Sequence, residues 1–431
     1  MTKIITNLHT RARHFAKTNP TIVNYGIDGI LVLGAMNIAV NNNNLFAMRL
    51  GATSVQLSLL HLFPSLLGLI LLIPAGFFAD SLKNKRHMIT AMLLVTGFFF
   101  LIVSTSAFVP IHTVYFFLIF VALATVSTNG LYNLAWLAFF PEVVPEEERN
   151  NVLTFRARMT MLVALVAPLM VGAVLAAVPS EGGKIITHQI FYVIVALLFV
   201  ANAFHFRKIK AILPAKPQRI TRTEMKLAVK GLISNKKFVV FTLAVLFFHA
   251  TWHFDWTLYF IGQYRYLQMN EFMLMLAPIT TTFAQLLTLK FWSKLNTKIG
   301  VDKPLTFGIL GLSLNPIAMI VGTSLPAPIG MYVFVVLHFI AMLTFAIVLL
   351  NVFQCLLNVI GEEYRSFTIA LYSCLIMLSN ALMPRIGVGI YTMLGENLSA
   401  LRWTFVIAFG LRLVAAGVWW LRCRYAIVQG K

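Results

Sequence analysis

The segment Gly76-Phe-Phe-Ala-Asp80-Ser-Leu-Lys-Asn-Lys85-Arg86 decides how the rest of the chain is interpreted. It lies between two long apolar runs, near residues 54–79 and 88–109, and places a glycine, an acid and a basic cluster in a very short connection. An acid at the edge of a membrane helix is costly and usually has a role. The simplest interpretation is a stop-transfer loop whose basic residues stay inside the cell. The alternative is a functional loop between two membrane helices.

The composition indicates a protein that crosses a membrane many times. Of its 431 residues, 59% are hydrophobic and 11% are charged, and the mean hydropathy is +0.84. A soluble domain cannot bury so large an apolar fraction. Cys355, Cys374 and Cys423 lie in apolar or helix-end sequence without paired spacing, so neither disulfides nor a metal site are expected. The polar, basic first 20 residues lack the apolar core of a signal peptide.

Twelve apolar runs are long enough to span a bilayer, for which about 20 residues suffice. They fall near residues 22–47, 54–79, 88–109, 112–140, 152–178, 187–206, 238–262, 271–292, 304–323, 329–358, 367–393 and 402–421. These runs predict an all-α polytopic membrane protein of twelve transmembrane helices. Six helices form an N-terminal half (residues 1–206), a basic cytoplasmic linker follows (207–237), and six more form a C-terminal half (238–431). Within the linker, residues 221–233 are expected to form a short surface helix.

The positions of lysine and arginine predict the orientation in the membrane. With the N-terminus inside, the inner segments hold most of the basic residues. The outer loops hold only Arg49, Lys184, Arg265 and Arg402. Basic residues are enriched in cytoplasmic loops, so both termini are expected in the cytoplasm, with the chain in the cytoplasmic (inner) membrane. The net charge of +20 then reflects topology and attraction to anionic lipid, and no nucleic-acid partner is expected.

The two halves share sequence features at a nearly constant offset. Glu-Glu-Glu-Arg149 precedes the fifth span and Glu-Glu-Tyr-Arg365 precedes the eleventh, and Pro168 maps onto Pro384 at the same offset. Residues 291–303 form a weaker counterpart of the opening segment, in which Thr297 replaces the acid. Three matches in the same order predict two six-helix halves related by parallel repetition.

These motifs resemble the major facilitator superfamily. In that family, the loop between the second and third helices has the pattern G-x-x-x-D-x-x-G-R-K/R. Gly76, Asp80, Lys85 and Arg86 fit this pattern, whereas Lys83 occupies the second glycine position. The loop ending in Arg149 and the fifth-helix run Ala-Pro-Leu-Met-Val-Gly, residues 167–172, are most similar to drug-proton antiporter branches. Ala and Val replace two glycines of that run, and the exporters' fourth-helix arginine is absent from residues 112–140.

The resemblance implies a secondary active transporter that moves a small solute by alternating access. The expected process is proton-coupled efflux by a monomer. The alternatives are proton-coupled uptake of a polar metabolite, and a non-transporting assembly factor or sensor. The resemblance also places the second and eleventh helices together at the cytoplasmic side. The residues then expected to form a conformational gate are Gly76, Asp80, Lys85, Arg86, Arg149 and Arg365.

Two acids lie within spanning sequence, Asp28 in the first run and Asp255 in the seventh. A carboxylate at membrane depth must be paired, protonated or hydrated, so both are candidate proton carriers; a structural hydrogen bond is the alternative. His249 and His253 share a helical face with Trp252 and Trp256 and are further candidates for proton coupling. This face could instead belong to an interfacial aromatic belt. It could also chelate a metal, but no third ligand is evident, so no metal is expected.

Polar stripes mark candidate substrate-binding residues on other helices. Interhelical hydrogen bonds are the alternative role for such stripes. Ser58, His61 and Ser65 form one stripe on the second helix. The residues assigned to substrate binding are Asn37 and Asn41 on the first helix, Asn129 and Asn133 on the fourth, Trp252 and Trp256 on the seventh, Asn351 and Gln354 on the tenth, and Arg385 on the eleventh.

Three arginines within spans need partners or water. Arg385 needs an anion, which is an acidic substrate or a carboxylate such as Asp28 or Asp255. Arg156 is expected to snorkel to the interface, and Arg412 to face either lipid headgroups or a partner helix. The chain has no phosphate-binding Gly-x-x-x-x-Gly-Lys-Ser/Thr motif. We therefore expect no ATP hydrolysis, no enzymatic activity and no cofactor.

Overall fold

The computed structural model describes residues 19–82, 84–209, 222–360 and 365–429. In this part of the chain, twelve helical segments are long and apolar enough to cross a membrane, which confirms the all-α fold with twelve membrane helices. The elements of the first half are α2 (Pro20–Arg49), α3 (Ser54–Ser81), α4 (Lys85–Val103), η1 (Ser106–Phe108), α5 (Thr113–Thr125), η2 (Val126–Tyr132), α6 (Asn133–Val143), α7 (Glu146–Ala177) and α8 (Glu181–Phe206).

The second half follows a short helix, α9 (Arg222–Ser234), at the place where the sequence predicts a surface helix. Its remaining elements are α10 (Lys236–His253), α11 (Trp256–Ile261), η3 (Gly262–Tyr266), α12 (Glu271–Ile299), α13 (Asp302–Leu312), α14 (Leu314–Thr323), α15 (Ala327–Met342), α16 (Phe345–Val359), α17 (Arg365–Met393) and α18 (Leu398–Gln429).

Several of the predicted spans are interrupted rather than continuous. The ninth and tenth spans are each built from two helices, α13–α14 and α15–α16. The fourth contains the π-helical segment η2, and such segments often occur at functional sites. At Gly130 in η2, an added Cβ would lie 3.0 Å from Leu72 Cδ2, so a glycine lets α3 approach closely. The seventh span breaks at Asp255, whose φ of −104° and ψ of 8° leave the helical region.

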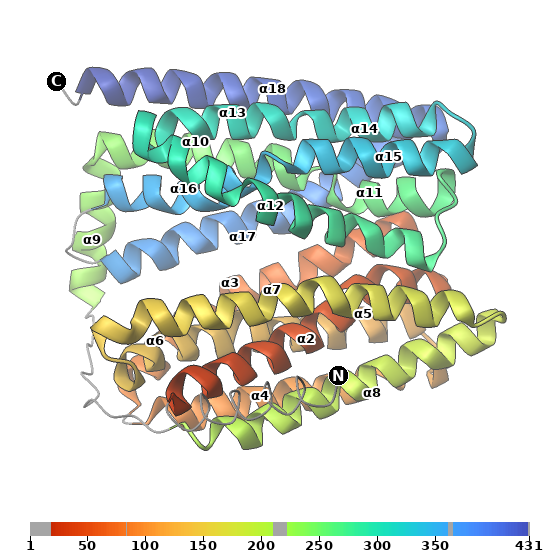
Figure 1. The fold of residues 1–431 in the computed structure, drawn as a ribbon, viewed down its shortest axis with the longest axis horizontal. Coiled ribbons are helices and arrows are strands. Elements are labelled where there is room, and N and C mark those ends of the chain that lie inside the picture. Colours follow the sequence, from red (N-terminus) through yellow and green to blue (C-terminus); the bar gives the residue numbers. More distant parts are fainter. Residues whose placement is uncertain (1–18, 83, 210–221, 361–364, 430–431) are drawn as a thin grey trace, which may run out of the picture.

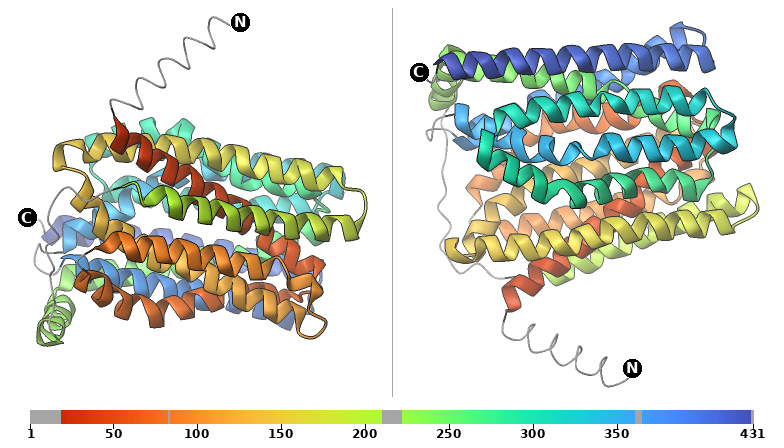
Figure 2. Two further views of the ribbon diagram at one scale, coloured as in Figure 1. Left: turned by 90° about the horizontal axis from the view of Figure 1, so that it is seen from below. Right: turned by 45° about the horizontal axis from the view of Figure 1, so that its top comes forward.

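Each half packs mainly on itself. In the first half, α2 packs against α7 and α8, and α4 packs against α8. In the second half, α18 packs against α10, α13 and α14. The halves meet mainly along two helix pairs, α3 with α17 and α7 with α12, and α3 also contacts α11. Figure 1 shows the second half above the first, and Figure 2 shows both from two further sides.

The two ends of the bundle differ. At one end, here called the latched end, Glu271 of α12 pairs with Arg49 of α2 and with Lys184 of α8, whose Nζ lies 2.7 Å from Glu271 Oε1. There, Ser54 of α3 also donates to the carboxylate of Glu396. The other end carries α9 and the end of α18, and we call it the basic end.

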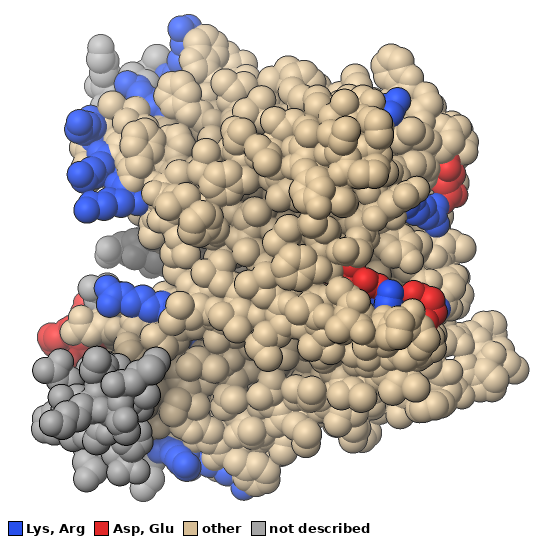
Figure 3. Space-filling view, turned by 45° about the vertical axis from the view of Figure 1, so that its right-hand side comes forward, with Lys and Arg blue, Asp and Glu red and all other residues tan. Residues whose placement is uncertain are grey.

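Among the described side chains, the ion pairs between the halves lie at the latched end. No ion pair between the side chains that the structure describes joins the two halves at the basic end. Figure 1 shows the ribbons of the two halves diverging toward that end. In Figure 3, opposite charges lie together between the halves at the latched end. The described ion pairs between the halves therefore hold the latched end together.

Candidate functional site

Two histidines and two tryptophans form a compact aromatic cluster where the halves meet. Helical spacing places His249, Trp252 and His253 on one face of α10, and Trp256 continues that face at the start of α11. The ring centroids of His249 and His253 are 5.3 Å apart, and those of His253 and Trp256 are 4.5 Å apart. His253 is buried and 3% exposed, whereas His249 is half-buried.

The other half of the molecule contributes a third histidine to this cluster. The ring centroid of His61, on α3, lies 5.5 Å from that of Trp256. The sequence placed His61 in a polar stripe but did not connect it to α10, because helical periodicity does not identify the neighbouring helix. On the same helix, Ser65 accepts a hydrogen bond of 3.2 Å from Asn380 of α17. We define the His–Trp cluster as His61, His249, Trp252, His253 and Trp256.

The cluster has polar groups available for a solute or a proton. His253 Nδ1 lies 3.2 Å from Ser379 Oγ of α17. His249 Nδ1 is buried and has no hydrogen-bond partner among the described residues. A neutral imidazole has one donor and one acceptor nitrogen, and a protonated one has two donors. Protonation therefore reverses the hydrogen-bonding role of one nitrogen on each ring, at a surface shared by α3, α10 and α17.

Asp28 lies at the centre of the first half and accepts hydrogen bonds from four side chains. Tyr132 Oη lies 2.8 Å from its carboxylate, Asn202 Nδ2 2.9 Å, Trp136 Nε1 3.1 Å and Arg156 Nη2 3.3 Å. Asp28 is fully buried. The network joins α2 to helices α6, α7 and α8 and to η2. In this conformation the carboxylate is held by its own half, and its assignment as a proton carrier stays a prediction.

Arg156 corrects one expectation from the sequence. We expected it to snorkel to the membrane interface, but it points inward and pairs with Asp28. Its guanidinium carbon also lies 4.5 Å from the centroid of the Trp136 ring. A buried carboxylate and an aromatic face stabilise the guanidinium better than the distant interface does.

Asp255 is paired with an arginine in the second half. Its Oδ1 lies 2.6 Å from Arg412 Nη2 of α18, and Arg412 Nη1 donates to the carbonyl oxygen of Leu312 at 2.9 Å. Asp255 is 0% exposed and Arg412 2%. We expected Arg412 to face either lipid headgroups or a partner helix. The structure shows the contact with partner helices.

Arg385 is not paired with either intramembrane acid. We expected Asp28 or Asp255 to balance it if no substrate did, and both of these pairings are wrong because each acid has an arginine from its own half. Arg385 is half-buried on α17. No ion pair joins it to another side chain that the structure describes. It stays a candidate for recognising an anionic group of the solute.

The amides predicted on the fourth helix are exposed. Asn129 and Asn133 lie on the face between Tyr132, which bonds to α2, and Gly130, which faces Leu72 of α3. The helix therefore presents both amides between its two neighbours, away from the core of the first half. This placement fits the predicted role in solute binding.

The remaining predicted amides differ from one another. Asn37 and Asn41 are half-buried, and each donates at 2.8 Å to a carbonyl oxygen of its own helix, which leaves the amide oxygen for other partners. Gln354 on α16 is exposed. Asn351 is fully buried and bonds to Asn296 of α12 at 2.6 Å and to the Val301 carbonyl oxygen at 2.7 Å. Asn351 therefore forms interhelical hydrogen bonds, which is the alternative role given above for polar stripes. We leave it out of the proposed site.

The predicted gate residues that the structure describes contact their own half. Lys85 forms a buried ion pair with Glu142, and Arg86 donates at 3.1 Å to the carbonyl oxygen of Arg207. Arg149 donates at 3.2 Å to the Val144 carbonyl oxygen. The Cβ that Gly76 lacks would lie 3.7 Å from Leu134. The side chains of Asp80 and Arg365 lie outside the described part, and so does the pairing expected for Asp80.

The composition of the cluster does not match a metal centre. Among the described residues, no group of three or more histidine, cysteine, aspartate or glutamate side chains could hold a metal ion. The two imidazoles of α10 instead face aromatic rings and a hydroxyl group. A polytopic bundle of two packed halves, with polar and titratable side chains at their contact and ion pairs joining them at one end, has the geometry of a transporter.

Comparison with known sequences agrees with this architecture. Residues 27–382 match the sequence model of the Major Facilitator Superfamily. The chain belongs to the Major Facilitator Superfamily. It is accordingly a multi-pass membrane transporter and not an enzyme. No curated protein matches the chain in sequence.

Several solved structures of this superfamily share the fold. A bacterial homologue of the iron transporter ferroportin, in an inward-facing state, is 12% identical with a TM-score of 0.74, and the match covers 94% of this chain and 98% of that one. The nucleoside transporter NupG is 12% identical with a TM-score of 0.70, covering 94% and 99%. A D-xylose-proton symporter is 15% identical with a TM-score of 0.64, covering 94% and 97%. Identities this low establish the fold alone.

Proposed function

We propose that this transporter exports a small polar solute from the cytoplasm in exchange for protons, by alternating access and as a monomer. The His–Trp cluster carries this proposal. It brings titratable side chains of both halves to their contact surface, through His61 on one side and His253 and Trp256 on the other. Histidine has an ordinary pKa of about 6.5. A proton gained there changes the charge at the surface along which the halves must move.

Exposed polar side chains on the membrane helices support a polar solute. Asn129, Asn133 and Gln354 offer exposed amides, which donate and accept hydrogen bonds. Arg385 has no ion-pair partner among the described side chains and would accept an anionic group. The solved relatives that carry nucleosides and D-xylose handle solutes of similar polarity, which favours this class.

We infer further that the basic end faces the cytoplasm and that the membrane is the cytoplasmic one. Lysine and arginine are enriched in cytoplasmic loops, and the linker helix α9 lies at this end. The structure would then represent the state open to the cytoplasm, ready to take up solute from that side. The outer side would be closed by Arg49, Lys184 and Glu271.

Export is the favoured direction because the loop ending in Arg149 and the fifth-helix run at residues 167–172 are similar to those of drug-proton antiporters. Proton-coupled uptake of a polar metabolite is the second candidate. The exposed amides favour it, since an apolar cation would form few hydrogen bonds with Asn129, Asn133 and Gln354. The sign of the pH gradient that drives accumulation distinguishes the two.

The test is flux in proteoliposomes with an imposed pH gradient and a pooled panel of drugs and polar metabolites. We expect gradient-dependent movement of at least one polar solute, and His253→Asn should abolish accumulation while sparing solute exchange. His112→Asn, at an exposed histidine outside the cluster, is the control. Absence of flux for every solute would contradict transport. Unchanged accumulation in His253→Asn would remove the cluster from coupling but leave transport standing.

Asp255→Asn tests the second candidate for coupling. If Asp255 exchanges its proton during the cycle, accumulation should be lost and exchange retained in this variant as well. The companion variant Asp255→Asn/Arg412→Gln removes the unpaired charge, so it separates a loss of coupling from a loss of folding. Normal accumulation in either variant would exclude Asp255 from the mechanism.

A further inference from the structure

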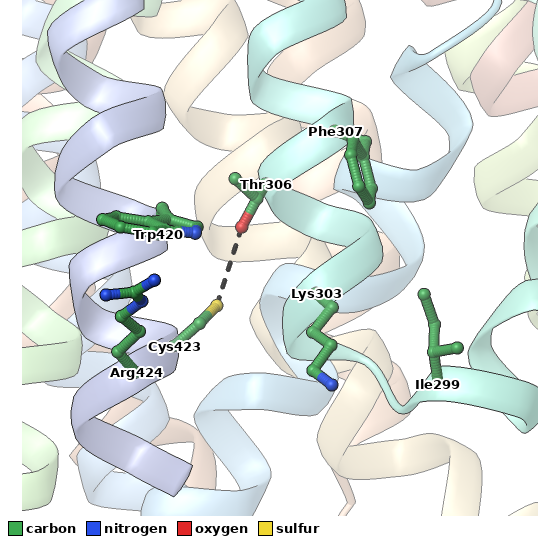
Figure 4. A pocket seen from close by; sticks show the side chains of 7 residues that line it. All are labelled: Ile299, Lys303, Thr306, Phe307, Trp420, Cys423 and Arg424. Carbon is green, nitrogen blue, oxygen red and sulfur yellow. Dashed lines mark hydrogen bonds between the residues drawn. The ribbon is translucent and has the colours of Figure 1, made fainter. Parts of the chain in front are cut away.

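A basic groove lies at the basic end of the second half, on the side away from the first half. It is a pocket of about 450 Å³ between the start of α13 and the end of α18. Lys303 and Thr306 come from α13, and Trp420 and Arg424 from α18, as Figure 4 shows. We call this pocket the C-groove. Both helices lie at the outer edge of the second half, above the contact with the first half in Figure 1.

The C-groove combines two unpaired cations with an apolar surface. Neither Lys303 nor Arg424 forms an ion pair with a described side chain, and both are exposed. The neighbouring acid, Asp302, is paired with the buried Arg422 instead. Arg424 stacks over the Trp420 ring at 3.9 Å. Phe307 and Trp420, which are 56% and 45% exposed, continue the lining as an apolar surface.

The positions of these side chains along the membrane spans match the arrangement of headgroup and acyl chains in a phospholipid. Lys303 is the second residue of its membrane span, and Arg424 is the last residue of its span. Both cations therefore lie at the headgroup level of the bilayer. Phe307 and Trp420 lie one helical turn deeper, because each is four residues further into its span. A phosphate between the cations would leave its acyl chains along these rings.

The first half contains a corresponding groove. This N-groove, of about 390 Å³, is lined by Arg86, His87 and Thr90 of α4 and by Arg207 at the end of α8. Lys303 lies as many residues after Arg86 as Arg424 lies after Arg207. The two grooves are therefore related by the internal repeat. Neither groove is lined by an acid.

An unpartnered hydroxyl group supports a ligand in the N-groove. Thr90 is only 6% exposed, and its Oγ1 has no hydrogen-bond partner among the described residues. A buried hydroxyl without a partner is unfavourable. In the C-groove, the hydroxyl group of Thr306 already has a partner, Cys423 Sγ at 3.6 Å. A phosphate or glycerol oxygen in the N-groove would supply the partner that Thr90 lacks.

From these observations we propose that each groove binds one anionic phospholipid, with the phosphate held between the two cations of the groove. Basic pockets between membrane helices on the cytoplasmic side suit anionic headgroups. A zwitterionic lipid would place its own ammonium group near the two cations and gain less. The lipids would anchor the outer helices of each half and leave the contact surface of the halves free to move.

Native mass spectrometry of the detergent-solubilised protein tests this proposal, with phosphatidylglycerol and phosphatidylcholine of identical acyl chains as probes. We expect two tightly bound phosphatidylglycerol molecules and no comparable phosphatidylcholine binding. Lys303→Gln/Arg424→Gln should retain one site and weaken the other about 30-fold, since each cation near an anionic lipid contributes about a factor of five. Arg207→Gln should weaken the N-groove site selectively.

Matched controls separate site binding from net charge. Lys290→Gln/Lys294→Gln removes two exposed cations from α12 outside the grooves, and Lys208→Gln removes the cation next to Arg207. Neither should change binding, and the charge-conserving Lys303→Arg/Arg424→Lys variant should keep it. Equal binding of both lipids, or equal loss in the controls, would overturn the proposal. Displacement by excess inorganic phosphate alone would show a phosphate site and not a lipid site.

Discussion

Asp255 and Arg412 form a buried ion pair that connects the break in the seventh span to α18, with 2.6 Å between Oδ1 and Nη2. Asp255 lies two residues after His253 and directly before Trp256 in the chain, so the pair adjoins the His–Trp cluster. A buried pair contributes little net stability, but removing one partner leaves the other charge stranded. The pair therefore fixes the geometry of α10 and α11 beside the cluster.

The first prediction concerns this pair. Asp255→Asn should lower the free energy of unfolding by about 3–5 kcal/mol, because Arg412 is left buried without its counterion. Asp255→Asn/Arg412→Gln should recover part of that loss, since neither charge then remains. Thermal unfolding in detergent measures both. Additive losses in the double variant would show that the two residues are energetically independent.

Much of the fold follows from sequence, whereas the partners of the buried charges do not. Apolar runs and charge asymmetry predict the twelve spans because both depend on residues near one another in the chain. The pairs Asp28–Arg156 and Asp255–Arg412 join helices far apart in sequence. Periodicity gives the face of a helix that a residue occupies, but not the neighbour of that face. This is also why His61 could not be assigned to the His–Trp cluster.

The second prediction concerns the latched end. Glu271→Gln should shift the population toward a state in which this end is open, because Glu271 pairs with Arg49 and Lys184 of the other half. Distances between spin labels near the ends of α2 and α12 report this shift. Glu181→Gln is the matched control: Glu181 pairs with the same two cations, but from their own half, and its side chain is 68% exposed. An equal shift in the control would refute a latch between the halves.

The third prediction concerns pH and Glu396, which lies between two membrane spans. The hydrogen bond from Ser54 and the ion pair with Arg265 lower the pKa of Glu396 from its ordinary value of 4.5, although partial burial acts in the opposite direction. A lowered pKa means that the contact is fully formed above pH 4.5 and is lost as the pH falls through the lowered value. Spin-label distances between α3 and the loop before α18 should therefore be constant from pH 8 to 5 and increase in stronger acid. Glu396→Gln should remove this acid dependence.

The last prediction returns to Asp80. Helices α3 and α17 run antiparallel, since Ser65 bonds to Asn380 and a Cβ on Gly68 would meet Met377. From the first contact to the second, the chain advances three residues along α3 and goes back three residues along α17. When this register is continued along both helices, Asp80 lies level with Arg365. We predict that these two residues pair when the basic end closes.

Asp80→Asn should then favour the state open at the basic end, because the predicted ion pair with Arg365 would form only when that end is closed. Labelling of a single cysteine at Asn129, in a background without Cys355, Cys374 and Cys423, should accelerate. Arg365→Gln should act in the same direction, the charge exchange Asp80→Arg/Arg365→Asp should restore the slow rate, and Arg158→Gln should change nothing. An unchanged labelling rate in Asp80→Asn would leave the segment from Gly76 to Arg86 as a stop-transfer loop. Faster labelling without recovery in the exchanged pair would retain Asp80 as a gate residue but exclude Arg365 as its partner.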